Sequence, residues 1–122
     1  MSRQLLWVSP ELVDQILLVA ESEELVETCG VVTPDSQVMR LPNVSSSPAN
    51  SYEIRSEDLV NALVDYCRRA NVELRDIDCQ DVIIWHTHPN GLIGPSRRDM
   101  QYKVNGFRYV VITLPTREVI QF

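Results

Sequence analysis

Apolar residues recur with two different periods along this chain, and these periods separate expected helices from expected strands. Ser9-Pro10-Glu11 places a hydroxyl, a proline and an acidic residue in succession, which is typical of a helix start. Apolar residues then recur every three or four positions from Leu12 to Ala20. This period predicts a first helix that ends near Ser22.

A second helix is marked by charge as well as by period. Two acidic residues follow Ser56, an apolar stripe runs from Leu59 to Cys67, and Arg68 and Arg69 come next. Acidic residues near the start of a helix and basic residues near its end both suit the helix dipole. We therefore expect Ser56 to cap a helix that ends near Arg69.

Strands are expected where short β-prone runs lie between turn residues. Asp81–Trp85 contains a continuous apolar segment, as a buried strand does. Pro34-Asp35-Ser36 has the composition of a hairpin turn between two other runs. The remaining predicted strands are Thr28–Thr33, Gln37–Leu41, Ser51–Ile54, Phe107–Thr113 and Glu118–Phe122, with a loop over Asn43–Asn50 and a short third helix that opens at Ser96.

The expected order of elements is α-β-β-β-α-β-α-β-β, with no repeat or linker that would split residues 1–122. Helices and strands are interspersed, and several links between strands are too short for a parallel crossover. The pattern predicts one α+β (mixed α/β) domain, in which helices flank a mixed central sheet.

Composition and charge narrow the class of protein. Hydrophobic residues make up 44% of the chain and charged residues 23%, as in globular proteins. A formal net charge of -6 suits a phosphate backbone poorly, so we expect no nucleic-acid partner. No apolar run approaches the ~18–20 residues of a membrane span, and the N-terminus lacks a signal-peptide pattern. Cys29, Cys67 and Cys79 are odd in number and lack a CxxC spacing, which indicates reduced thiols in an intracellular protein.

The chain's two histidines, His86 and His88, follow the buried run at positions that share one face of a strand. Such a pair can bind zinc. Asp99 follows after a loop rich in glycine and proline, which can fold back toward them. Three protein ligands would leave a fourth zinc position for water, as in catalytic sites. The residues alone leave another reading open, because paired histidines also occur on wet strand ends and Ser96 with Asp99 can simply form a capping box.

The stretch His86-Thr87-His88-Pro89, followed by Ser96 and Asp99, resembles the JAMM motif of the MPN+ (JAB domain) zinc metalloprotease family. That motif reads H-x-H-P and then S-x-x-D, with a glutamate well upstream. Glu27-Thr28-Cys29-Gly30 closely resembles the E-T-C-G run of the AMSH-like branch. The likeness also includes Leu41-Pro42-Asn43, Pro48 and Tyr52-Glu53-Ile54, and so covers nearly the whole chain.

The resemblance implies an MPN/JAB-like fold, similar to cytidine deaminase, and a role for each motif residue. His86, His88 and Asp99 would hold one Zn2+ per chain. Glu27 would accept a proton from water and pass it to the leaving amine. Ser96 would donate a hydrogen bond to the oxyanion. Taken without the resemblance, Glu27 also fits an ordinary exposed acid that follows other glutamates.

The implied activity is hydrolysis of a peptide or isopeptide bond by a zinc metallopeptidase. The chain lacks room between Asp99 and Phe107 for the insertion that holds a second zinc in the AMSH-like group, so it is more similar to compact bacterial or phage members. We expect the substrate to be a protein or peptide with an extended tail, such as a ubiquitin-like or phage tail protein. The expected location is the cytoplasm of a bacterial or phage-infected cell, or the virion.

Two alternatives to this enzyme stay open from the sequence: a RadC-like protein, whose motif is similar, and a scaffold MPN domain within an assembly. Oligomeric state also stays open. Four basic residues follow or adjoin the motif, and we expect them to form a cluster beside the site. They are Arg97, Arg98, Lys103 and Arg108. Such residues are usually a solvated face, and whether they hold an acidic substrate tail stays open from the sequence.

Overall fold

The structure is a computed structural model that describes residues 8–20 and 26–122. Its elements, in chain order, are α1 (Pro10–Ala20), β1 (Cys29–Val32), β2 (Val38–Leu41), α2 (Ser56–Ala70), the short 3-10 helices η1 (Leu74–Asp76) and η2 (Cys79–Asp81), β3 (Ile83–His88), α3 (Arg97–Tyr102), β4 (Arg108–Thr113) and β5 (Glu118–Gln121). The predicted helix end at Ser22 lies outside the described residues. Over 8–20 and 26–122, no helix combines the length and apolarity that crossing a membrane requires.

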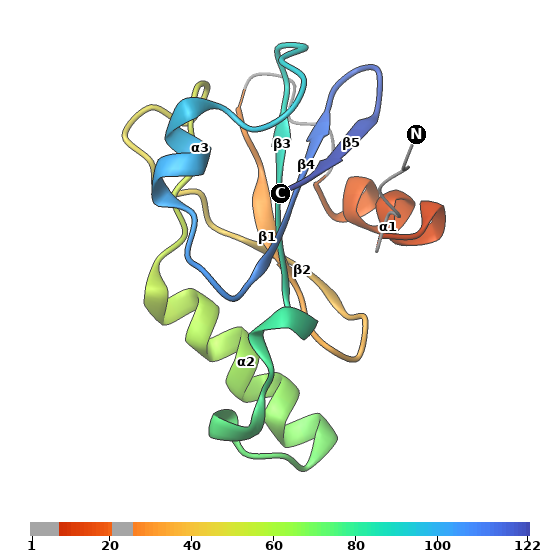
Figure 1. The fold of residues 1–122 in the computed structure, drawn as a ribbon, viewed down its shortest axis with the longest axis vertical. Helices are drawn as coiled ribbons and strands as arrows, with labels where there is room; N and C mark the ends of the chain where they lie inside the picture. The colour runs from red at the N-terminus through yellow and green to blue at the C-terminus, as the bar shows by residue number, and fades with distance from the viewer. Residues whose placement is uncertain (1–7, 21–25) are drawn as a thin grey trace.

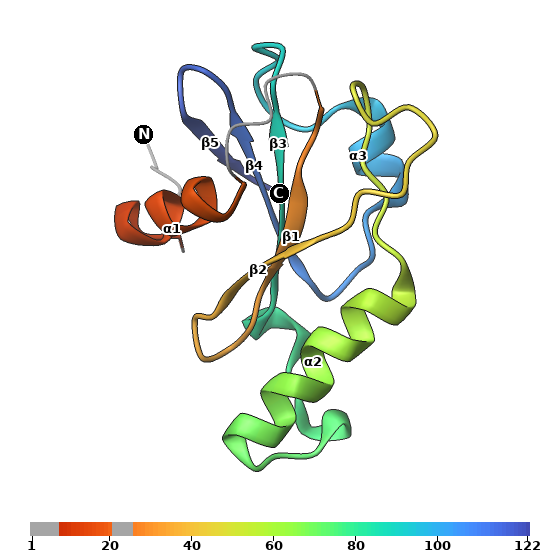
Figure 2. The ribbon, with the colours of Figure 1, turned by 180° about the vertical axis from the view of Figure 1, so that it is seen from behind.

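The five strands form one mixed sheet in the order β2-β1-β3-β4-β5. Only the central β3–β4 pair is parallel; the other three pairs are antiparallel. A parallel pair needs a long crossover, and here the crossover from β3 to β4 contains α3. Helices lie on both sides of the sheet, with α1 on one side and α2 and α3 on the other (Figure 1). Figure 2 shows the same arrangement of helices on the two sides of the sheet from behind. The predicted mixed sheet flanked by helices is confirmed.

Successive residues of β3 point to opposite faces of the sheet, and this alternation separates the core from the site. Trp85 is fully buried in the cluster that includes Val13 and Ile16 of α1. On the opposite face, a second cluster joins β1 to Ala62 and Leu63 of α2. The neighbours of Trp85 along β3 therefore lie on the face covered by α2 and α3. His86 and His88 share that face, as their spacing predicted.

Gly30 allows Trp85 to pack directly against the backbone of β1. A Cβ atom at this position would lie 2.0 Å from the carbonyl oxygen of Met39 and 2.5 Å from the Trp85 ring. No side chain fits at those distances, so only glycine preserves the contact between the core tryptophan and β1.

The predicted strand Ser51–Ile54 is wrong, because this segment is irregular. Its backbone is paired with an asparagine side chain and with its own loop. Asn43 Nδ2 donates to the carbonyl of Ser51 at 3.0 Å, and Asn43 Oδ1 accepts from Glu53 N at 3.0 Å. Val44 N donates to the carbonyl of Glu53 at 2.9 Å. Hydrogen bonds from a side chain of this kind satisfy backbone groups that would otherwise pair with a neighbouring strand.

Two predicted boundaries also change. Ser56 is the first residue of α2, and the capping position before it is Arg55, whose side chain makes no capping hydrogen bond. The strand predicted over Asp81–Trp85 begins at Ile83, because Asp81 belongs to η2, and it continues to include both histidines. The histidines therefore have the fixed geometry of a central strand instead of a loop.

Candidate metal centre

Two neighbouring strands bring three of the predicted site residues to one face of the sheet. Thr87 N donates to the carbonyl of Thr28 at 2.9 Å, which extends the antiparallel β1–β3 pairing beyond β1. Glu27 therefore lies opposite His88. Residues two apart on a strand share a face, so His86 lies on that face as well.

The fourth residue, Asp99, arrives from α3 after the chain reverses direction. Gly91 and Gly94 have φ values of 82° and 80°, a left-handed conformation that glycine adopts without strain. Asp99 N then donates to Ser96 Oγ at 3.0 Å, and Ser96 N donates to Asp99 Oδ2 at 2.8 Å. This is a capping box. The two readings of the motif are thus compatible, because the box fixes the carboxylate that reaches the histidines.

The four side chains converge on one point. Asp99 Oδ2 lies 3.0 Å from His86 Nε2 and 3.1 Å from His88 Nε2, while Glu27 Oε2 lies 3.9 Å from His88 Nε2. One ligand atom from each residue lies within 4.8 Å of the others. All four side chains are buried, and Glu27 is 4% exposed, so the reading of Glu27 as an exposed acid is wrong.

Proton placement in this cluster fits a bound cation. His88 Nδ1 lies 3.1 Å from the carbonyl oxygen of Leu92, which requires the proton to be on Nδ1. Thr113 Oγ1 donates to the same carbonyl at 2.7 Å and fixes its position. A neutral His88 would present the lone pair of Nε2 to Asp99 Oδ2, and His86 Nε2 lies only 3.2 Å away. Electron pairs directed at one another in a buried site fit a metal ion, with the Leu92 contact orienting the ring.

The electrostatics of the four groups support the same fit. Burial opposes ionisation of Asp99, but its contacts with the imidazoles of His86 and His88 hold its pKa well below the usual range. Burial lowers the pKa of His86 and keeps its ring neutral. Burial also acts to lower the pKa of His88, yet the neighbouring carboxylates of Asp99 and Glu27 raise it overall. A carboxylate beside electron-rich imidazoles is a donor set that suits zinc.

Glu27 lies farther from the shared point than the other three residues, since its Oε2 is 3.9 Å from His88 Nε2 while the other ligand atoms lie 3.0 to 3.2 Å apart. Its Oε1 is buried and has no hydrogen-bond partner within 8–20 and 26–122. Burial raises the pKa of Glu27 to about 7, against the opposing effect of His88. A free carboxylate oxygen with a raised pKa can take up and release a proton near neutral pH, as a general base must.

Asn43 holds the backbone around Glu27. Its Nδ2 donates to the carbonyls of Glu27 and Ser51 at 2.8 and 3.0 Å. Its Oδ1 accepts from the backbone N–H groups of Ser45 and Glu53 at 3.1 and 3.0 Å. One side chain therefore joins the start of β1 to the loop that follows β2. Its position was named in the sequence only as part of a family-like segment, and its role required the tertiary contacts.

We expect Asn43→Ala to lower the free energy of unfolding by about 2–6 kcal/mol, since four hydrogen bonds contribute about 0.5–1.5 kcal/mol each. Urea unfolding would measure this loss. Asn50→Ala is the matched control, because Asn50 is exposed in the same loop. Equal stability of the two variants would show that the Asn43 contacts do not hold this segment.

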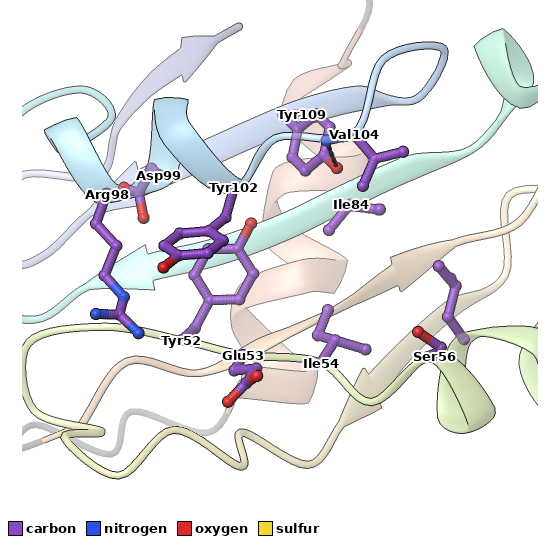
Figure 3. A pocket seen from close by; sticks show the side chains of 11 residues that line it. Tyr52, Glu53, Ile54, Ser56, Ile84, Arg98, Asp99, Tyr102, Val104 and Tyr109 are labelled. Atoms are coloured by element: carbon purple, nitrogen blue, oxygen red, sulfur yellow. Dashed lines mark hydrogen bonds between the residues drawn. The ribbon is translucent and has the colours of Figure 1, made fainter.

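Two pockets adjoin the cluster from different sides. One, of about 330 Å³, includes Asp99 and Tyr52 among its lining residues (Figure 3). The other, of about 370 Å³, includes Glu27 and Asn43. Tyr52 also stacks on the His86 ring, with centroids 4.2 Å apart. The sequence placed Tyr52 in a strand and gave no sign of this contact, which depends on how the loop folds over β3.

The predicted basic cluster is only partly present. Arg98 lines the pocket beside Asp99, with its guanidinium 5.2 Å from the centroid of the Tyr102 ring. Arg97 is exposed on the same helix, and Lys103 ends it. Arg108 is not part of the cluster, because it pairs with Ile83 at the opposite end of β3 from His88. Five residues of strand separate those ends by about 16 Å.

Comparison with known proteins places the chain. It matches the family described as prokaryotic homologs of the JAB domain over residues 9–121. A protein from Salinibacter ruber (strain DSM 13855), solved in solution, is similar at 20% sequence identity, with a TM-score of 0.48, over 93% of this chain and 78% of that chain. No curated protein shows significant similarity to the sequence.

Proposed function

The chain belongs to the prokaryotic homologs of the JAB domain, and from this we propose that it is a zinc-dependent metallopeptidase or isopeptidase. The observation that supports the proposal best is the buried convergence of Glu27, His86, His88 and Asp99. Two carboxylates and two imidazoles, removed from water, cost stability unless a ligand or charge pairing compensates them. A metal-dependent activity accounts for that arrangement.

The proposed chemistry gives three of the four residues the role of metal ligands and the fourth the role of general base. His86, His88 and Asp99 would hold the ion, because their ligand atoms lie within about 3 Å of one another. Zinc bound there would supply a Lewis acid that polarises the scissile carbonyl and lowers the pKa of water to about 7. Glu27 would accept the proton from that water on its unpartnered oxygen and later return it to the leaving amine.

Ser96 has a second proposed role besides capping α3. Its Oγ accepts a hydrogen bond from Asp99 N, and a hydroxyl that accepts still has its own proton to donate. Directed at the oxyanion of the substrate, such a donor is typically worth about 2.7–4 kcal/mol of the barrier. Ser96 would thus stabilise the developing charge while it keeps Asp99 in place.

A scaffold role is the alternative that family membership by itself allows. It would need none of the four residues, so their burial around one point favours catalysis. The match to the prokaryotic homologs of the JAB domain supports a metallopeptidase over a RadC-like protein. The match carries no information about a phage tail, and that role rests on the motif alone.

We propose that the substrate enters as an extended, flexible chain terminus or linker, with small residues at the scissile bond. Edge strands such as β2 can pair with an extended peptide through backbone hydrogen bonds. Two pockets of about 330 and 370 Å³ beside a buried centre also suit a chain better than a folded surface. A fusion whose cleavage segment is flexible should therefore be cut faster than one whose same segment is locked in a helix.

We expect one zinc per chain, because the described residues hold a single group of three or more metal-binding side chains close enough to share an ion. Elemental analysis of protein purified without chelator would measure the ratio. Cys79→Ser should keep the zinc, since Cys79 lies outside the group. A ratio near two, or zinc retained by the His86→Ala, His88→Ala double variant, would contradict the site.

The activity itself is tested by a cleavage screen. Zinc-loaded protein is incubated with a panel of ubiquitin-like proteins fused through their C-terminal tails to a reporter, and products are identified by mass. Cleavage by the wild type that chelation abolishes and zinc restores supports the proposal. Zinc-loaded protein that cuts no fusion and no unstructured peptide would favour the scaffold.

A further inference from the structure

The pocket on the Asp99 side of the cluster, here the Asp99-side pocket, differs in its lining residues from the pocket on the Glu27 side. Its buried members are Ile84, Tyr109 and Asp99, at 5%, 3% and 5% exposure. Tyr109 Oη accepts a hydrogen bond from Val104 N at 2.8 Å, which fixes the polar end of the ring at one side of the pocket. Ile54 adds another aliphatic wall (Figure 3). The cavity, of about 330 Å³, is at the lower end of the range for ligand sites.

The pocket opens directly onto the candidate metal centre. Asp99 belongs to both, and Tyr52 lines the pocket while it stacks on His86. Glu27 instead lines the other pocket. Whatever fills the Asp99-side pocket therefore lies next to the reacting bond, on the side away from the proposed base. This continuity points to a side chain of the substrate and not to a separate ligand.

The rim of the pocket carries exposed apolar side chains together with one cation, Arg98, and one acidic residue, Glu53. Nine large hydrophobic side chains are exposed among the residues described, and five of them lie in the segment 92–104 that carries Asp99. Tyr102 and Val104, 65% and 56% exposed, line the pocket itself. Concentrated exposed apolar surface marks a binding site. Arg98, over the Tyr102 ring, adds a cation at the rim of a chain whose net charge is -6.

From these contacts we infer that the Asp99-side pocket is a specificity site that binds a bulky apolar side chain of the substrate, with an adjacent acidic residue paired to Arg98. The inference rests on the proposed hydrolase function and names the substrate class: an extended peptide with a leucine-sized residue next to an aspartate or glutamate, close to the scissile bond. The apolar side chain supplies affinity through burial, and the charge selects the neighbouring residue.

Peptide binding to the Glu27→Gln protein tests this without cleavage. The probes are three decapeptides in a Gly-Ser background that contain Leu-Asp, Ala-Asp or Leu-Lys, titrated into 15N-labelled protein. We expect the Leu-Asp peptide to bind about tenfold more tightly than Ala-Asp, from the extra buried methylene groups. It should bind about threefold more tightly than Leu-Lys, as an exposed ion pair allows. Equal affinity for Leu-Asp and Ala-Asp would overturn the inference.

Two pairs of variants test whether the pocket lining and Arg98 cause these two binding preferences. Val104→Asp places a charge in the lining and should remove the leucine preference, whereas Met100→Asp, exposed on the same segment outside the lining, should retain it. Arg98→Glu should reverse the preference between Leu-Asp and Leu-Lys, whereas its neighbour Arg97→Glu should not. If either control acts like its partner, the pocket is not the binding site.

Cleavage of fusions that carry the same dipeptides, measured beside peptide binding, separates this inference from the hydrolase proposal. Zinc-dependent cleavage of fusions at equal rates with leucine or alanine at the tested position would leave hydrolysis standing and overturn the pocket assignment. A leucine preference that Val104→Asp removes, without cleavage of any fusion, would support the pocket as a peptide-binding site and overturn the hydrolysis.

Discussion

Replacing Glu27 by glutamine should lower kcat by about 10²–10⁴-fold and leave the zinc content unchanged, because the amide cannot accept a proton from water. Glutamine has nearly the same shape as glutamate. The backbone of Glu27 is held independently of its side chain, by Asn43 and by a 2.7 Å hydrogen bond from its N–H to the carbonyl of Pro48. The substitution therefore alters the base without moving the strand.

Zinc analysis and single-turnover cleavage of the same protein preparation would measure both quantities. Glu57→Gln is the matched control, since Glu57 is an exposed acid in the first turn of α2 that lines neither pocket and lies outside the four-residue cluster. The assignment of Glu27 as base fails if the glutamine variant loses its zinc, which would make Glu27 a ligand. It also fails if the variant cleaves at the wild-type rate.

Replacing Asp99 should remove both zinc and activity. Asp99 Oδ2 is the point shared by His86 Nε2, His88 Nε2 and Ser96 N. We expect Asp99→Ala to weaken zinc binding by more than about 100-fold, beyond the 10–100-fold cost of changing a residue that only supports a ligand. Competition with a chromogenic chelator would give the affinity.

Because Asp99 also closes the capping box of α3, the alanine variant should lose about 1 kcal/mol of stability as well. Asp99→Asn separates the two effects, since its amide oxygen can still accept from Ser96 N but carries no charge. It should fold like the wild type and bind zinc poorly. Wild-type zinc affinity in a folded Asp99→Asn protein would show that the carboxylate is not a ligand.

The core elements could be predicted because their patterns are local. The apolar period of Leu12–Ala20 and the stripe before Cys67 match α1 and α2, and the VIIW run matches the buried centre of β3. Burial of one face fixes such periods whatever the neighbours are. Helix boundaries were less certain, since the cap of α2 is Arg55 and its geometry depends on the preceding loop.

The candidate site was predictable for a different reason. His86 and His88 alternate with Trp85, so their common face follows from strand geometry. Asp99 was identified through its spacing, and Glu27 only through the resemblance, because nothing local separates it from an exposed acid. The register between β1 and β3 is what sets Glu27 opposite His88.

By itself the sequence determined the helices, the central strand, the identity of the four candidate residues and the family-like motif, since these depend on side-chain type and on spacing along the chain. Only the tertiary structure decided the loop over residues 42–55. Asn43 satisfies the backbone there, which prevents the expected strand and brings Tyr52 against His86. The Asp99-side pocket and the exclusion of Arg108 from the basic cluster likewise depend on contacts between segments distant in sequence. No periodicity encodes such contacts, because each is fixed by packing and hydrogen bonding across the fold.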